Sequence, residues 1–133
     1  MTDLSVAERI FLLRSTRAFG RLYDSEIGSI ALACRHRTFR PGEVVARAGR
    51  PLRQLHLVAT GAVVDERAGP LPRVFGASSL LTGHALEAGL RADPVEGASC
   101  LLLSRPHFFT LVNEYPPLLV SLLEDWREEF GGS

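Results

Sequence analysis

The chain has 133 residues, of which 46% are hydrophobic and 23% charged, which is the composition of one ordinary globular domain. Its 15 cationic residues balance 15 acidic ones, which excludes a nucleic-acid binder that depends on bulk positive charge. Two cysteines are too few for a disulfide framework, and no apolar run approaches the roughly 20 residues of a membrane span. The chain also begins without the pattern of a signal peptide. These features predict a single domain over residues 1–133 in the cytoplasm.

Charge is distributed unevenly along the chain. Residues 1–53 carry ten arginines and five acids, whereas residues 54–133 carry five arginines and ten acids. The basic segment either packs beside the acidic one within the domain, which is the simpler interpretation, or meets it head to tail in another subunit. Every cation is an arginine, a usage typical of a GC-rich bacterial genome.

Two helices are predicted at the N-terminus. Over residues 5–16, Ser5 and Glu8 have the spacing of a capping box, and apolar residues follow at helical intervals. Over residues 24–34, Asp24 or Ser25 is the expected N-cap of a second helix with one apolar face.

The middle of the chain, residues 35–103, has the pattern of short antiparallel strands. Glycine or proline interrupts it about every ten residues, and the apolar segments between them are short. Strands are predicted at residues 44–47, 54–59, 62–64, 89–92 and 98–103.

Helical periodicity returns at the C-terminal end. Ser104 is the expected cap of a helix to about residue 114, the pair Pro116–Pro117 ends it, and a last helix reaches about residue 130. Helices at both ends of a strand-rich middle predict an α+β fold, a small antiparallel β-barrel or jelly roll flanked by N- and C-terminal helices.

Three segments resemble a known family. They are Phe39–Val45 (FRPGEVV), Leu55–Val63 (LHLVATGAV) and Phe75–Gly83 (FGASSLLTG). In this order and spacing they resemble the cyclic nucleotide-binding domain family, of the catabolite activator protein type, over residues 5–130. The resemblance implies a jelly roll of the double-stranded β-helix type, with a phosphate-binding cassette that begins at Phe75 and Gly76.

The same resemblance implies which cassette residues would hold a ligand. Members that bind cyclic nucleotides place a glutamate on the ribose and an arginine on the phosphate; here these positions are Ala77 and Leu86. Glu87 replaces a serine or threonine and would repel the phosphate. Two missing charge-assisted bonds, worth roughly 1.5–3 kcal/mol each, predict a loss of about two to four decades of affinity. The degenerate cassette pocket therefore comprises Phe75, Gly76, Ala77, Ser78, Ser79, Leu86, Glu87 and Ala88, with no cyclic nucleotide and no cofactor expected.

Two features could restore an anion site. Arg91, in the strand after the cassette, could turn inward and supply the missing cation. Ser78 and Ser79, with nearby backbone N–H groups, could hold a small anion, although helix capping is the simpler role for these hydroxyls. The scattered His56, His84 and His107 show no metal-ligand spacing, and no catalytic set is expected.

The last helix carries a broad apolar stripe, part of which we expect at an interface with a protein partner or a second copy. The interface candidates are Leu118, Leu123, Trp126 and Phe130, with the core as the alternative place for the last two.

The sequence favours a non-catalytic domain that has lost cyclic nucleotide binding and acts in protein interaction, assembly or regulation. The alternative is a small-molecule sensor that uses non-standard contacts, with an uncharged or cationic ligand because of Leu86 and Glu87. A third interpretation is a regulatory piece of a longer kinase, channel or transcription factor. No DNA-reading helix-turn-helix follows in this sequence.

Overall fold

The computed structural model describes residues 3–129, with side chains described as far as Leu123. Three short helices open the chain: α1 (Val6–Arg14), the 3₁₀ helix η1 (Phe19–Arg21) and α2 (Asp24–Ala33). The middle contains strands and one short helix, in the order β1 (Arg35–Phe39), β2 (Val44–Ala46), β3 (Gln54–Gly61), β4 (Val63–Asp65), β5 (Gly69–Pro70), β6 (Val74–Phe75), α3 (Ala77–Thr82), β7 (Leu90–Ala92) and β8 (Ala98–Ser104). Two helices close it: α4 (Arg105–Glu114) and α5 (Pro116–Glu129).

The helix ends follow local side-chain chemistry. The Ser5 hydroxyl accepts from the Glu8 amide at 3.1 Å and the Glu8 carboxylate accepts from the Ser5 amide at 3.0 Å, so the predicted capping box is confirmed. The N-cap predicted for the second helix is wrong. The helix begins at Asp24, and the Glu26 carboxylate instead accepts from the amide of Tyr23, the residue before it, at 2.7 Å. Ser104 caps α4 as predicted.

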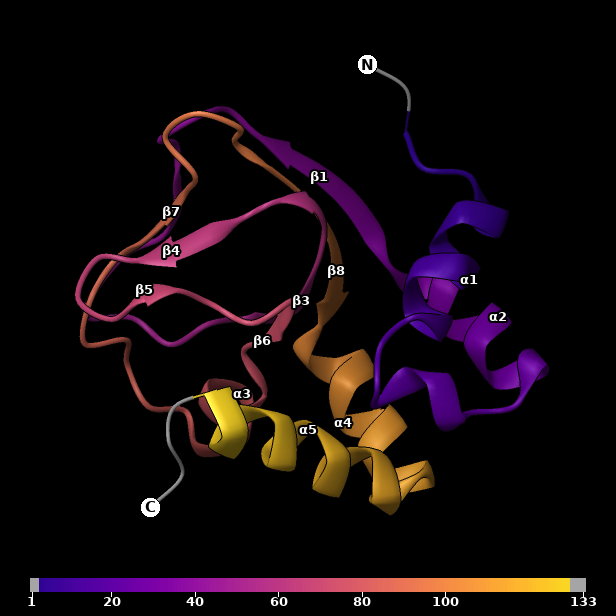
Figure 1. Cartoon of the computed structure of the whole chain (residues 1–133). Coiled ribbons are helices and arrows are strands. Elements are labelled where there is room, and N and C mark those ends of the chain that lie inside the picture. The colour runs from indigo at the N-terminus through magenta and orange to yellow at the C-terminus, as the bar shows by residue number, and fades with distance from the viewer. Residues whose placement is uncertain (1–2, 130–133) are drawn as a thin grey trace.

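The strands form two antiparallel sheets of four strands each. We call β1-β8-β3-β6 the helix-covered sheet and β2-β7-β4-β5 the outer sheet. Figure 1 shows the resulting layers, with α1 and α2 on one side, the helix-covered sheet in the middle and the outer sheet on the far side. The predicted jelly roll with flanking helices is confirmed, and its two sheets remain separate rather than closing into a barrel.

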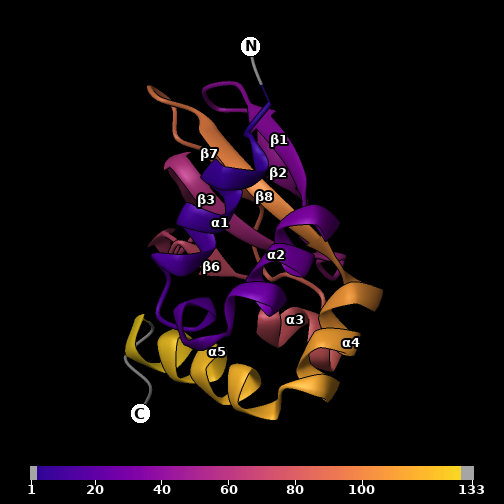
Figure 2. The ribbon, with the colours of Figure 1, turned by 90° about the vertical axis from the view of Figure 1, so that its right-hand side faces the viewer.

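In the helix-covered sheet, β3 and β8 bury residues on both faces because side chains alternate along each strand. Leu57, Leu101 and Leu103 pack in the core beneath the helices. Their neighbours Val58, Cys100 and Leu102 pack in a second core between the sheets, together with Phe39 and Phe75. Figure 2 shows α1 and α2 lying over β3 and β8, with α5 crossing the end of the molecule near α3.

Gly61 lets the end of β3 approach the start of β8 closely. Gly61 has a φ of +72°, and a Cβ added there would lie 2.1 Å from the Gly97 carbonyl oxygen. Only glycine fits this position without displacing backbone. Within residues 3–129, no helix has the length and apolar character required to cross a membrane.

Candidate functional site

The cassette segment begins with a backbone turn that requires glycine. Gly76 follows β6 with a φ of +109°, and a Cβ there would lie 3.0 Å from the Gln54 carbonyl oxygen. The chain then enters α3, which Gly83 ends with a φ of +72°. Two left-handed glycines therefore fix the start and the end of this one-and-a-half-turn helix.

The first cassette residues pack inward. The Phe75 ring stacks on His56 with ring centroids 4.7 Å apart and an interplanar angle of 13°. Ala77 is buried, and its methyl group lies in the core beneath the helices together with Leu80. Ala77, which the resemblance matches to the ribose-binding carboxylate, is therefore a small side chain facing the protein interior.

The serines of α3 do not cap it. Ser79 Oγ accepts from the Leu52 amide at 3.0 Å and donates to the His84 carbonyl oxygen at 3.0 Å. Its hydroxyl thus joins the loop before β3 to the end of the cassette helix. The Ser78 carbonyl oxygen accepts from Thr82 Oγ1 at 2.9 Å. The N-terminus of α3 has no side-chain cap, so the capping role expected of these hydroxyls is wrong.

The second half of the cassette is held by backbone pairing. Leu86 accepts from the Gly49 amide at 2.8 Å and donates to the Arg50 carbonyl oxygen at 3.0 Å, while its side chain packs against the core between the sheets. Ala88 is buried as well. The structure therefore brings residues 75–79 and 86–88 into one segment around α3, with an apolar side chain at the expected arginine position.

Glu87 does not face this segment. Its side chain is 86% exposed, and its carboxylate lies 3.3 Å from the Arg67 guanidinium. The predicted repulsion of a phosphate by Glu87 is therefore corrected, because this charge points to solvent and is paired. Arg91 does not turn inward either, since its Nε lies 2.7 Å from Glu66 and its Nη1 donates to the Gly42 carbonyl oxygen.

No protein-family model matches the chain, and no curated protein matches it. Many solved structures do. The regulatory subunit of a cAMP-independent protein kinase A from Trypanosoma brucei superposes with a TM-score of 0.73 at 20% identity, over 93% of this chain and 47% of that one. Thermus thermophilus catabolite activator protein superposes with a TM-score of 0.69 at 23% identity, over 86% of this chain and 58% of that one. A chain described as PKAR CBD2, bound to Sp-2Cl-cAMPS, superposes with a TM-score of 0.73 at 16% identity, over 98% of this chain and 97% of that one.

The chain has a cyclic nucleotide-binding domain fold. It spans less than half of the protein kinase A regulatory chains from Toxoplasma gondii and Trypanosoma brucei that it matches. A three-substitution mutant of the trypanosome subunit is described as bound to cAMP in its A site. These neighbours are named as regulatory subunits or an activator, and identities below 25% establish the shared fold alone.

Beside the cassette, this cyclic nucleotide-binding fold has a cavity of about 450 Å³ that sequence reasoning missed. It lies under the loop before β3. Its walls come from β1, β2, β3 and that loop, namely Arg37, Phe39, Val45, Ala46, Arg47, Arg50, Pro51, Leu52, Arg53, Gln54 and His56. The excess of arginine in residues 1–53 was the available signal, but it did not reveal that Arg37 of β1 and three arginines of the loop before β3 would line one cavity.

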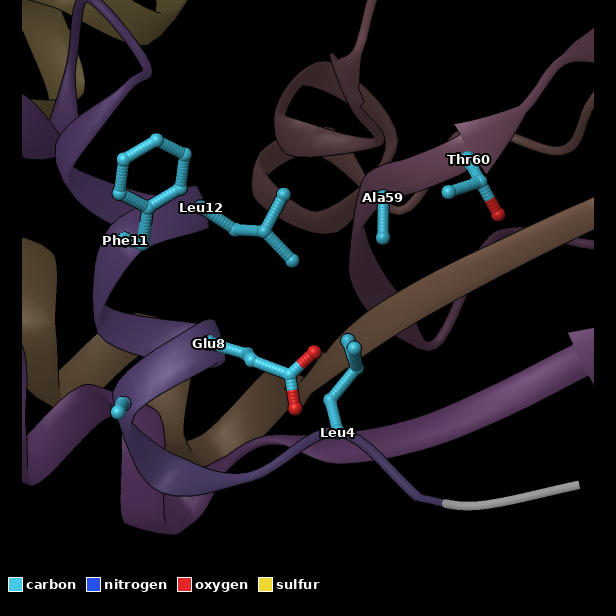
Figure 3. A pocket seen from close by; sticks show the side chains of 7 residues that line it. Leu4, Glu8, Phe11, Leu12, Ala59 and Thr60 are labelled. Atoms are coloured by element: carbon cyan, nitrogen blue, oxygen red, sulfur yellow. The ribbon is translucent and has the colours of Figure 1, made fainter.

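A second cavity of the cyclic nucleotide-binding fold is apolar. Figure 3 shows it between α1 and the end of β3, surrounded by Leu4, Glu8, Phe11, Leu12, Ala59 and Thr60. Its volume is about 400 Å³, and Ala7 also lines it. Phe11 is 75% exposed at its rim. This groove belongs to the N-terminal helices, whereas the sequence placed the candidate contact surface on the last helix.

The interface candidates on the last helix differ in how far they are buried. Leu118 is 3% exposed and packs in the core beneath the helices, so in this fold it is unavailable to a partner. Leu123 is half-buried. The side chain of Trp126 and all of Phe130 lie outside the described residues. On the described part of α5, Val120 is the large apolar side chain that is exposed.

The two cysteines are buried and unpaired. Burial raises the pKa of the Cys34 thiol to about 11 and that of Cys100 to about 12, so both stay protonated near neutral pH. Among residues 3–129, the histidines, cysteines and carboxylates form no group of three or more that could hold a metal ion.

Proposed function

We propose that this chain is a non-catalytic regulatory module of the cytoplasm that uses the cyclic nucleotide-binding fold without a cyclic nucleotide. It acts through contact with another protein chain, either a distinct partner or a second copy. The names of its structural neighbours support a regulatory role, because several are subunits whose task is regulation.

One observation carries the loss of the nucleotide. The two positions that would bind ribose and phosphate are occupied by Ala77 and Leu86, and both side chains pack into the protein. At the cassette edge, Arg67 is exposed and paired with Glu87. A cyclic phosphate would lose its solvation there without gaining a charged partner.

A structural neighbour supports the idea that the fold can regulate without this ligand. The trypanosome regulatory subunit is described as part of a cAMP-independent kinase, and a mutant of it is described as bound to cAMP. We infer that the present chain likewise acts without cAMP.

The experiment is a thermal-shift titration with cyclic AMP and cyclic GMP at millimolar concentration. We expect no shift for the unsubstituted chain, because a ligand at 100 times its Kd would add about 2.7 kcal/mol, which is a shift of several degrees. A double variant, Leu86→Arg and Glu87→Ser, which adds a cation at a half-buried position and leaves the buried Ala77 unchanged, should gain a shift. A control with Arg67→Gln alone should gain none. A saturable shift of the unsubstituted chain with either nucleotide would contradict the proposal.

Contact with another chain is tested separately. Sedimentation velocity of the purified chain over a wide range of concentration should show a dimer in exchange with monomer if the partner is a second copy. Strictly monomeric behaviour would remove self-association and leave a distinct partner as the proposal.

A second candidate function, small-molecule sensing through non-standard contacts, is favoured by the arginine-lined cavity. The ligand that we expected from the sequence was uncharged or cationic, because of Leu86 and Glu87. The cavity supports the opposite charge, since Glu87 points away to solvent and four arginines line the space.

A further inference from the structure

We propose that the cavity under the loop before β3 is a binding site for a small organic anion with a hydroxyl group and an apolar body. Its anionic part, a phosphate, sulfonate or carboxylate, would lie against Arg47, Arg50 and Arg53. None of the lining residues belongs to the cassette segments 75–79 and 86–88, so this site is separate from the one considered above.

The first support is unbalanced charge. Arg47, Arg50 and Arg53 are exposed and make no ion pair or side-chain hydrogen bond with any described residue. Arg37 is only loosely paired, with its Nη2 at 3.9 Å from Glu43, and its guanidinium lies 4.6 Å from the centre of the Phe39 ring. Like charges around one concavity repel one another, and a bound anion would relieve that repulsion and accept several charge-assisted bonds.

The second support is the floor of the cavity. Phe39 and Leu52 are buried and present apolar surface, and Val45 is half-buried beside them. Arginines around an apolar floor are suited to an anion attached to an apolar body.

A buried histidine supplies the third support. His56 lines the cavity although it is only 5% exposed, and its Nδ1 lies 3.0 Å from the Gln54 carbonyl oxygen. A carbonyl only accepts, so Nδ1 carries the proton and Nε2 is left as an acceptor. Nε2 has no hydrogen-bond partner among the described residues. In the described part of the chain, every fully buried side-chain nitrogen or oxygen has a hydrogen-bond partner, so Nε2 is not fully buried. We infer that Nε2 opens on the cavity, where a ligand hydroxyl can donate to it.

The cavity also has the size and the rigidity of a ligand site. Its 450 Å³ falls within the roughly 300–1,000 Å³ of small-molecule pockets. The loop that roofs it is held in place by the Leu52 amide on Ser79 and by the backbone pairing of Gly49 and Arg50 with Leu86. The site is therefore formed before a ligand arrives.

The test uses the aromatic anion 1-anilinonaphthalene-8-sulfonate as a fluorescent probe on the folded full chain. We expect saturable fluorescence that pyrophosphate and added salt displace. The double variant Arg50→Gln and Arg53→Gln should bind the probe about tenfold more weakly or worse, because it loses two charge-assisted contacts. The matched double variant Arg21→Gln and Arg67→Gln removes the same charge elsewhere and should bind normally.

Other variants separate this cavity from the apolar groove and from loss of fold. Phe11→Ala at the α1 groove should leave probe binding unchanged, and equal thermal melts should confirm that both arginine variants fold. The proposal is overturned if the probe does not bind, if Arg50→Gln and Arg53→Gln leave its affinity unchanged, or if Phe11→Ala abolishes it. It is also overturned if an acidic polypeptide such as polyglutamate displaces the probe while pyrophosphate does not, which would identify a macromolecular partner instead. Failure here leaves the cyclic nucleotide titration unaffected.

Discussion

Arg9 fastens α1 to the start of the chain and to the end of α2. Its Nε donates to the Leu4 carbonyl oxygen at 3.1 Å, its Nη1 to those of Ala31 and Cys34 at 3.2 and 2.6 Å, and its Nη2 pairs with Asp3 at 3.1 Å. Because only 12% of the Arg9 side chain is exposed, water cannot readily replace these bonds when they are lost.

Replacing Arg9 should therefore cost stability. We expect Arg9→Gln to lower the free energy of unfolding by about 2–3 kcal/mol, because two helix-end carbonyls lose a charged donor. Urea unfolding measures this. Arg21→Gln, at an exposed arginine of η1, is the control and should change stability by less than about 0.5 kcal/mol. Equal effects at the two positions would show that the Arg9 bonds contribute nothing.

His56 makes stability depend on pH. Burial first, and the nearby positive charge of Arg37 in addition, lower the pKa of His56 to about 4 from its ordinary 6.5. Between these values the unfolded chain takes up a proton that the folded chain does not, so stability falls as the pH drops from 6.5 toward 4. The loss should approach the order of 3 kcal/mol.

Urea unfolding of each variant at pH 7.5 and at pH 4.5 measures this difference. His56→Phe should flatten the pH dependence in that interval, whereas His84→Phe, at an exposed histidine, should retain it. An unchanged slope in His56→Phe would assign the dependence to other groups.

At the scale of elements, the close approach of Gly61 in β3 to the Gly97 carbonyl before β8 is the sharpest constraint. Gly61→Ala should destabilise the chain by more than about 3 kcal/mol, because the new methyl would overlap the Gly97 carbonyl in addition to the left-handed strain. Gly69→Ala is the matched control. Its φ is +89° but nothing lies within 4 Å, so only the strain of about 1–2 kcal/mol remains. Thermal unfolding of the two variants compares them, and similar losses would argue against the close approach.

The elements that the sequence predicted are those with local chemistry at their ends. Ser5 with Glu8, and Ser104, mark helix starts by side-chain geometry that three or four residues determine. β1 was not predicted from its pattern, because four of its five residues are not buried and no apolar alternation is visible. β5 and β6 have two residues each and exist only because neighbouring strands pair with them.

In the cassette, too, locally determined features were predictable and features set by distant residues were not. Its backbone course was predictable because Gly76 and Gly83 specify the turns. The direction of Glu87 was not, since it depends on Arg67 twenty residues away. The arginine-lined cavity was also hidden, because β1, β2, β3 and a loop meet there only after both sheets have formed.

For the whole molecule, the helix-covered sheet supports two cores at once. Leu101 lies in the core beneath the helices and Leu102 in the core between the sheets. We expect Leu101→Ala and Leu102→Ala each to cost about 2–5 kcal/mol and to unfold the whole chain in one transition.

Circular dichroism of the helices and hydrogen exchange in the strands measure the two parts separately. Coincident transitions are expected in both variants, and Val120→Ala, at an exposed position on α5, should change little. A variant that melts one layer while the other persists would contradict a single cooperative unit.

The hydroxyl of Ser79 has a consequence for motion. It bonds the Leu52 amide and the His84 carbonyl oxygen, while Leu86 exchanges backbone bonds with Gly49 and Arg50. The loop over the arginine-lined cavity and the cassette therefore share one set of hydrogen bonds, so opening either segment breaks bonds that hold the other. Their amides should exchange with solvent as one kinetic unit, so ordering either segment slows exchange in both, whichever of them a ligand touches.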